Sequence, residues 1–386
     1  MSQLLDAGCC RRRQASEASR HYRRPFPARR AWLAAYAAGL ANNTDPDECR
    51  HAAATRLLDY YTHAACTAAR LLHPHRCRIR VPLAALAVGA TPEHLEDDRA
   101  ALAWLTTEHP ALLTMLRFAA DEGFDAHTWQ LAWALNTFLN RRGHWYDQAG
   151  AWQSAAIAAD RLTDPVAAAS AYRELAWANT RQGNYPQAET RLRRAMELCK
   201  EAGDQAGQAD THLGFAYFWE RQRRPELALR HAQQAVTLSQ AADDRPRQTH
   251  ALKTVGRIHA LCGDHAAALI HCQQAVTSHR QAGDRWGEAN AWDNIGEVYH
   301  RLGQLADALD CYKHALALVR DLGDRHYQAT ILTSLGSTHE AAGHPAAANI
   351  AFAEATKILI DLKHPDVEAV RTKLELLDQR GADTPC

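Results

Sequence analysis

The chain has 386 residues, of which 47% are hydrophobic, with 44 basic and 44 acidic side chains. Its formal net charge of zero disfavours a general nucleic-acid or membrane-binding surface. The ten cysteines form no CxxC pair, which argues against a disulfide framework, and no stretch reaches the roughly 18 apolar residues of a membrane span. We therefore expect a cytoplasmic protein that does not contact membranes.

The N-terminal quarter differs in composition from the rest. Residues 1–27 are rich in arginine and poor in apolar residues, which predicts a disordered arm. Two helices are expected over 28–75, the second capped by Asp45 with Pro46 at its first position. Residues 76–95 read as an irregular connector. The pattern over 96–121 predicts two short helices, around 97–107 and 110–121, separated by Pro110.

From about residue 125 the turn residues repeat. One series has a 40-residue period that only Arg223 interrupts, and a second series lies half a period away: Gly143, Gly183, Gly263, Gly303 and Gly343, then Gly203, Asp243, Gly283 and Gly323. Two interleaved series of helix breakers indicate one helix hairpin per 40 residues. The prediction is an all-α solenoid over 96–380, with a closing helix near 365–380.

Within one repeat, apolar and small residues occupy regular slots. Trp292, Ile295, Gly296 and Tyr299 share one helical face, and the next helix carries Ala308, Tyr312 and Ala315 in the same spacing. Small residues at 296 and 308 would let the two helices approach closely. These slots resemble the tetratricopeptide repeat, which implies a right-handed superhelix of hairpins. The likeness is good over 165–361 and looser over 125–164, and each repeat exceeds the usual ~34 residues.

A narrower resemblance covers most of the chain. Segments 31–38, 56–63, 101–110 and 129–135, with Gly-Asp-Arg turns at 283–285 and 323–325, are similar to the C-terminal half of AfsR-like bacterial transcription regulators. That family joins a nucleotide-binding module to tetratricopeptide repeats, and residues 28–75 would match the end of its winged-helix segment. The sequence has no GxxxxGK[ST] loop to hold a triphosphate, so we expect a stand-alone or truncated repeat half without ATPase or DNA-binding activity.

The tetratricopeptide resemblance also implies a binding surface. In that fold the first helix of each hairpin lines a concave groove, and here the groove would carry Trp133, Arg173, Trp177, Asp210, Tyr217, Lys253, Arg257, Asn290, Asp293, Asn294, Glu297 and His300. Exposed aromatic rings in a groove are typical partner contacts. Lys253, Arg257 and Asn294 partly match a clamp for a peptide carboxylate, while a merely solvated helix face is the alternative.

No catalytic constellation, cofactor site or metal site is expected. His259, Cys262, His265, His271 and Cys272 surround one hairpin, but their spacing matches no structural zinc site. We therefore predict a non-catalytic scaffold that captures a protein or peptide in bacterial regulation. The alternative is a split half of an AfsR-like regulator that acts with a separate ATPase or DNA-binding chain. Direct nucleic-acid binding by the arginine-rich arm is not expected, and the sequence leaves homo-oligomer formation open.

Overall fold

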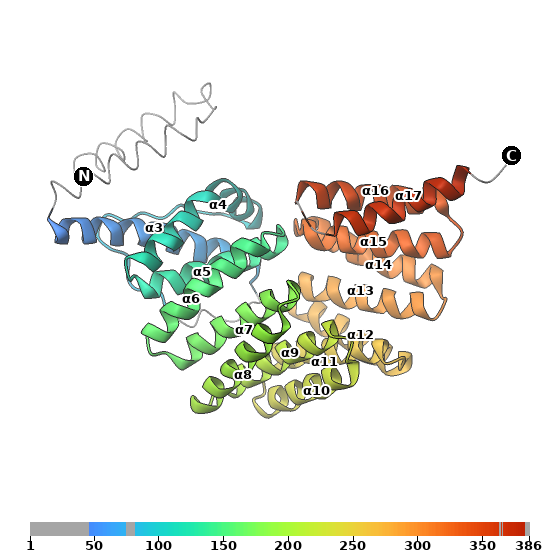
Figure 1. Cartoon of the computed structure of the whole chain (residues 1–386), viewed down its shortest axis with the longest axis horizontal. Coiled ribbons are helices and arrows are strands. Elements are labelled where there is room, and N and C mark those ends of the chain that lie inside the picture. Colours follow the sequence, from blue (N-terminus) through green and yellow to red (C-terminus); the bar gives the residue numbers. More distant parts are fainter. Residues whose placement is uncertain (1–45, 75–81, 363, 365, 383–386) are drawn as a thin grey trace, which may run out of the picture. The chain divides into compact units, whose positions relative to one another are not determined.

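The computed structural model describes residues 46–74, 82–362, 364 and 366–382. The arm expected at 1–27 and the first expected helix lie outside these residues. The described part of the chain forms fifteen α-helices, α3 to α17, and no strand (Figure 1). This confirms the all-α prediction. None of these helices is long and apolar enough to cross a membrane.

Two compact units share the chain. Of the described residues, the first comprises 46–64 and 84–94, and the second comprises 65–74, 82–83, 95–362, 364 and 366–382. Helix α3 (Asp47–Leu72) contributes to both. In the first unit the backbone N–H of Ala87 donates to the Asp59 carboxylate at 2.8 Å, which holds the non-helical segment against α3. The domain boundaries expected at 75 and 95 stay predictions.

The second unit consists of helices that follow one another in chain order, as Figure 1 shows from green to red. Twelve of them, α5 to α16, pair into hairpins, which α4 precedes and α17 follows. The bounds of all these helices are α4 Asp98–Asp121, α5 Asp125–Arg141, α6 Trp145–Arg161, α7 Pro165–Arg181, α8 Tyr185–Glu201, α9 Gln205–Arg221, α10 Pro225–Ala241, α11 Arg245–Leu261, α12 His265–Ala282, α13 Arg285–Arg301, α14 Leu305–Asp321, α15 Arg325–Ala341, α16 Pro345–Asp361 and α17 Val367–Ala382. The expected closing helix is therefore present as α17.

The prediction of a break at Pro110 was wrong, because α4 is one helix with Pro110 inside it. Its buried residues lie on both sides of the proline, with Ala101 and Leu105 before it and Leu112 and Leu116 after it. Burial of that continuous apolar stripe outweighs the one backbone hydrogen bond that proline removes.

The turns explain why the repeat continues where glycine is missing. The glycines of both series have positive φ angles, and Arg223 has the same conformation with φ of 58°. Asp243 and Thr163 likewise have φ of 49° and 53°. The left-handed turn is thus kept even with side chains that disfavour it. The hairpin of α5 and α6, whose sequence match was loose, has the same 17-residue helices as its neighbours.

Close helix contact depends on the small slot. A Cβ atom added at Gly296 would lie 2.8 Å from the ring of Tyr312, which is 1% exposed. One repeat later, a Cβ at Gly336 would lie 2.6 Å from the ring of Phe352. These contacts confirm that the aromatic ring of the second helix packs directly against a small residue on the first helix.

Candidate functional site

The residues predicted for the groove lie on the first helix of each hairpin, α5 to α13. We call the surface shared by those on α7, α9, α11 and α13 the odd-helix face. Asp210 on α9 lies between two arginines, 2.7 Å from Arg247 on α11 and 3.8 Å from Arg173 on α7. Burial disfavours the charge on Asp210, but attraction to Arg173 and Arg247 outweighs this and lowers its pKa. Ion pairs thus link three successive repeats.

Aromatic residues of the odd-helix face also contact each other. Trp177 stacks on Tyr217 with ring centroids 5.9 Å apart. The guanidinium of Arg181 lies 4.6 Å from the Trp177 ring and 3.5 Å from the ring of Trp145. Trp177 and Tyr217 are both half-buried, so each keeps part of its ring accessible for a partner.

Trp133 and Lys253 are both buried, although the sequence predicted that they line the groove. Trp133 is only 5% exposed, and every residue from 128 to 135 on α5 is buried. Helices α4, α6 and α15 contact α5, and the side chain of Gln130 donates to the carbonyl of Pro82. Trp133 is therefore a core residue, which corrects its assignment to the groove.

The carboxylate clamp is not favoured by the geometry. Lys253 is 4% exposed, and its ammonium lies 5.1 Å from the Trp286 ring. Arg257 is paired with Glu220 on the preceding odd-numbered helix. Both cations are already engaged, so neither is presented to a peptide carboxylate in the way that such a clamp requires.

A cavity of about 210 Å³ opens on this face. We call it the odd-helix pocket, and it is lined from α9, α11, α13 and α15 by Glu220, Arg257, Ala260, Leu261, Asp293, Asn294, Glu297, Arg301 and Ser334. Four predicted residues meet there: Arg257, Asp293, Asn294 and Glu297. The contribution of α15 was missed, although Ser334 lies 40 residues after Asn294 and the repeat period indicates it.

Two polar atoms in this pocket are buried without a hydrogen-bond partner, the amide nitrogen of Asn294 and Oε2 of Glu220. Such unsatisfied atoms are unusual in folded proteins because each costs free energy. One is a donor and the other an acceptor. A peptide group needs both kinds of atom, an acceptor for its N–H and a donor for its carbonyl.

Asp293 is held by a short chain of hydrogen bonds. The hydroxyl of Tyr327 donates to its carboxylate at 2.9 Å, and Asn290 donates to that hydroxyl at 2.8 Å. Burial raises the pKa of Asp293 to about 6, and nearby Glu297 adds to the effect. Glu297 also accepts from Arg301 at 2.7 Å.

His300, the last predicted groove residue, lies outside the odd-helix pocket. Its Nδ1 is 2.9 Å from the hydroxyl of Thr338 on α15. The contact joins α13 to α15, so His300 is engaged between repeats like most of the predicted set.

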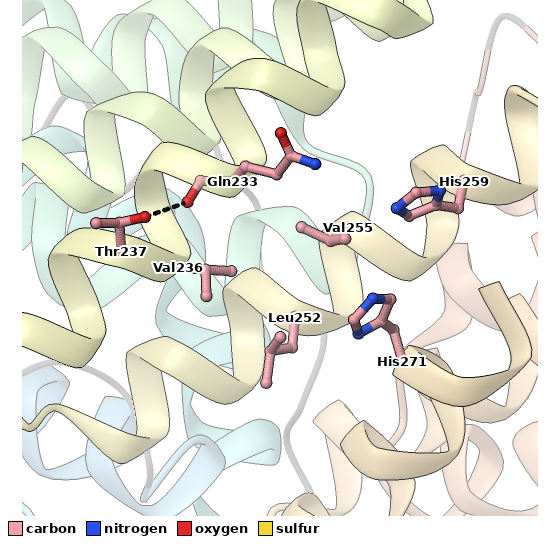
Figure 2. Close-up of a pocket in the computed structure, with 7 residues that line it drawn as sticks. All are labelled: Gln233, Val236, Thr237, Leu252, Val255, His259 and His271. Atoms are coloured by element: carbon pink, nitrogen blue, oxygen red, sulfur yellow. Dashed lines mark hydrogen bonds between the residues drawn. The ribbon is translucent and has the colours of Figure 1, made fainter. Parts of the chain in front are cut away.

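A second cavity, of about 270 Å³, lies among α10, α11 and α12. Figure 2 shows Val236, Leu252 and Val255 around it with His259 and His271 at one end. The two imidazole rings stack with centroids 5.8 Å apart, and burial lowers the pKa of His271. Cys272 is buried against Gly256 instead, so the histidines and cysteines of this hairpin do not converge on one point.

Comparison with known proteins agrees with this architecture. Tetratricopeptide-repeat models match residues 168–202 and 287–361. The regulatory protein AfsR of Streptomyces griseus is 28% identical over 242 residues, which cover 60% of this chain and 24% of AfsR. The chain thus spans about a quarter of the length of that relative.

Two solved structures share the fold. One is a signal-transduction ATPase with a tetratricopeptide-repeat sensor from Pyrococcus horikoshii, at a TM-score of 0.50 and 16% identity, covering 73% of this chain and 43% of that one. The other is a Rap protein complexed with Competence and Sporulation Factor, at 0.52 and 11%, covering 74% and 85%. The chain therefore contains tetratricopeptide repeats over residues 168–202 and 287–361, and it is similar to a part of the regulator AfsR.

Proposed function

We propose that this protein is a non-catalytic scaffold that binds an extended segment of a partner protein in the odd-helix pocket. The observation that carries the proposal is the pair of unsatisfied atoms, the Asn294 amide nitrogen and Glu220 Oε2, in one open cavity. A peptide backbone presents a carbonyl and an N–H within one residue, so it can satisfy both atoms at once. Trp177 and Tyr217 would add an aromatic contact on the same face.

The charges of the pocket favour a cationic partner residue. Glu220 is paired with Arg257, and Glu297 is paired with Arg301. Asp293 accepts from the hydroxyl of Tyr327, and the cation that attracts its charge, Arg257, is the one paired with Glu220. The lining residues thus carry three carboxylates and two guanidinium groups, one cation short of balance. A lysine, an arginine or a free amino terminus of the partner would supply that cation.

Binding without chemistry fits what surrounds the pocket. An ion pair holds Arg257 to a neighbouring repeat, and a hydrogen bond holds Asp293 to another. The fold is typical of proteins that present a surface to a partner. The Rap protein of the same fold is complexed with Competence and Sporulation Factor, and binding by this chain is a proposal by analogy with it.

Selection from a random peptide library tests the proposal. Peptides recovered on the immobilised chain should carry at least one basic residue, and their affinity is then measured by fluorescence anisotropy. Replacing Asn294 by alanine removes the backbone contact and should weaken binding about tenfold, since one lost hydrogen bond to a buried group costs about 1–2 kcal/mol. Asp293→Asn should weaken the binding of the same peptides, because it removes the excess negative charge of the pocket.

Asp310→Asn is the matched control, because Asp310 on α14 is exposed and pairs only with Lys313. It should leave affinity unchanged. Lowering the pH from 7.5 to 5 should weaken binding by the unmodified chain, because Asp293 with a pKa of about 6 loses its charge over that interval. The other charged lining groups are Glu220, Glu297, Arg257 and Arg301. Equal affinities of all three variants would contradict the assignment.

A second candidate follows from the similarity to AfsR. The chain would then act as the repeat portion of a regulator whose ATPase or DNA-binding part lies on another chain. Affinity purification from the native lysate should in that case recover a protein with a phosphate-binding loop. Recovery of that protein with the Asn294→Ala variant as well as the unmodified chain would place its contact outside the odd-helix pocket.

A further inference from the structure

We propose a site for a divalent transition-metal ion formed by His109, His144 and Asp147. One ligand atom from each residue lies within 4.8 Å of the others. His109 comes from α4, His144 precedes α6, and Asp147 is in the first turn of α6. Two imidazoles and a carboxylate are ligands that zinc, cobalt and iron share.

The geometry is close to what coordination needs. Nε2 of His109 lies 3.3 Å from a carboxylate oxygen of Asp147. Two ligands of one tetrahedral zinc ion are about 3.3 Å apart, given metal–ligand bonds of about 2.0–2.1 Å. The rings of His109 and His144 have centroids 4.4 Å apart, so small side-chain rotations would bring the third ligand into range.

The side chains are not committed to other roles. Nε2 of His109 is buried and, despite the nearby carboxylate, makes no hydrogen bond. His144 occupies the N-cap position of α6, yet its side chain makes no capping hydrogen bond. Phe138 on α5 packs against both imidazoles, with centroids at 5.4 Å and 6.0 Å. It forms an apolar wall behind them, as is common around metal ligands.

The charges around the three residues are mixed. The Arg142 charge and the N-terminus of α6 oppose a cation, and the Asp147 carboxylate offsets them.

Three protein ligands leave one tetrahedral position open for water or a further donor. A bound ion would connect α4 directly to the start of α6, which is otherwise linked to α4 mainly by side-chain packing. The sequence predicted no metal site. The histidine and cysteine group that it singled out was the one around His259 and Cys262, which is a different group. The proposed metal site does not depend on peptide binding.

Titration of the untagged, chelator-treated full chain with Co²⁺ tests the site, followed by Zn²⁺ competition. We expect one equivalent of cobalt with visible d–d absorption, and a rise in the melting temperature that grows with Zn²⁺ concentration. His109→Ala and Asp147→Asn should each weaken binding at least tenfold. Asp147 is 40% exposed, so Asp147→Asn should fold normally even if His109→Ala does not.

His339→Ala is the matched control, because His339 also faces a second histidine, His344, at a ring distance of 5.9 Å. It should bind cobalt like the unmodified chain. Absence of cobalt binding by the unmodified chain would overturn the proposal. So would equal binding by Asp147→Asn and the unmodified chain, since the ion would then lie elsewhere.

Discussion

Gly296 on α13 is in tight contact with a buried ring, and this contact makes its replacement costly. Alanine in place of glycine normally stabilises a helix by about 1 kcal/mol. At this position the added methyl group would lie 2.8 Å from the Tyr312 ring, and such overpacking costs about 1–3 kcal/mol. We expect Gly296→Ala to lower stability by up to about 2 kcal/mol in urea unfolding, the balance of these two effects.

Gly150→Ala on α6 is the control, because no atom lies within 4 Å of the position that its Cβ would take. It should raise stability by up to about 1 kcal/mol. Similar shifts for the two variants would show that α13 and α14 can separate without cost.

Thr163 is a β-branched residue in a left-handed turn, with φ of 53°. That conformation costs a non-glycine residue about 1–2 kcal/mol, while glycine loses about 0.5–1 kcal/mol more backbone entropy. Thr163→Gly should therefore raise the free energy of unfolding by about 0.5–1 kcal/mol. The melting temperature should rise accordingly. The reverse change, Gly203→Thr, meets open space at φ of 64° and should lose a similar amount. A gain with Gly203→Thr would contradict the argument from backbone strain.

At the scale of elements, Asp210 joins three helices of successive repeats. Removing its charge takes away the 2.7 Å partner of Arg247 on α9, and this arginine, which is 8% exposed, then keeps its ion pair with Asp244. Breaking one partner of a buried pair costs about 3–5 kcal/mol, and partial exposure of Asp210 reduces this to about 2 kcal/mol. We expect that loss for Asp210→Asn by thermal unfolding at pH 7.

The pH dependence of this contribution has a definite sign. The pKa of Asp210 in the folded protein is below its ordinary value of 3.8. The contribution is therefore present above that value and is lost as the pH falls through the folded pKa. The difference between Asp210→Asn and the unmodified chain should disappear in acid. In Asp310→Asn, which breaks only an exposed pair, stability should change by less than about 1 kcal/mol at any pH.

The helices were predictable from the sequence because each turn between them needs one residue with a left-handed backbone, and that residue is usually glycine. The period of the glycines therefore located the hairpins within a few residues. At Pro110 the same local reasoning failed, because burial of a stripe on both sides decides the outcome. Trp133 was misplaced because α5 packs against α15 as well as against its neighbours α4 and α6, and α15 is far from it in sequence. The odd-helix pocket was only partly predictable, since four separate helices contribute to it.

At the scale of the second unit, the first and last repeats touch. Helix α5 contacts α15, and the guanidinium of Arg141 donates to the carbonyls of Leu72 at 3.0 Å and Leu322 at 3.3 Å. Trp145 packs edge-on against His326 and His364, with centroids at 4.9 Å and 4.0 Å. A solenoid normally has contacts only between neighbouring repeats. Here residues 181 positions apart are joined, so the terminal repeats restrain each other.

Arg141 is the residue on which this restraint depends most. It is 3% exposed, and its charge offsets only part of the burial that raises the pKa of Asp324. Arg141→Met keeps the length of the side chain but removes a donor to the Leu322 carbonyl and the larger of the two cationic effects on Asp324, leaving that of Arg181. We expect a loss of about 3–5 kcal/mol and faster hydrogen exchange at the start of α15, measured by mass spectrometry over residues 323–331.

Arg161→Met separates a loss of the restraint from a general loss of arginine. Arg161 pairs with Asp125 at 2.6 Å within one hairpin and is 47% exposed, so its removal should lower stability far less than the removal of Arg141. Exchange at the start of α15 should then stay unchanged. Adding Asp324→Asn to Arg141→Met should recover part of the loss, because the uncompensated carboxylate is gone. If Arg141→Met instead left exchange at 323–331 as it is, the contact between the terminal repeats would carry no restraint, and the solenoid would behave as a chain of neighbours only.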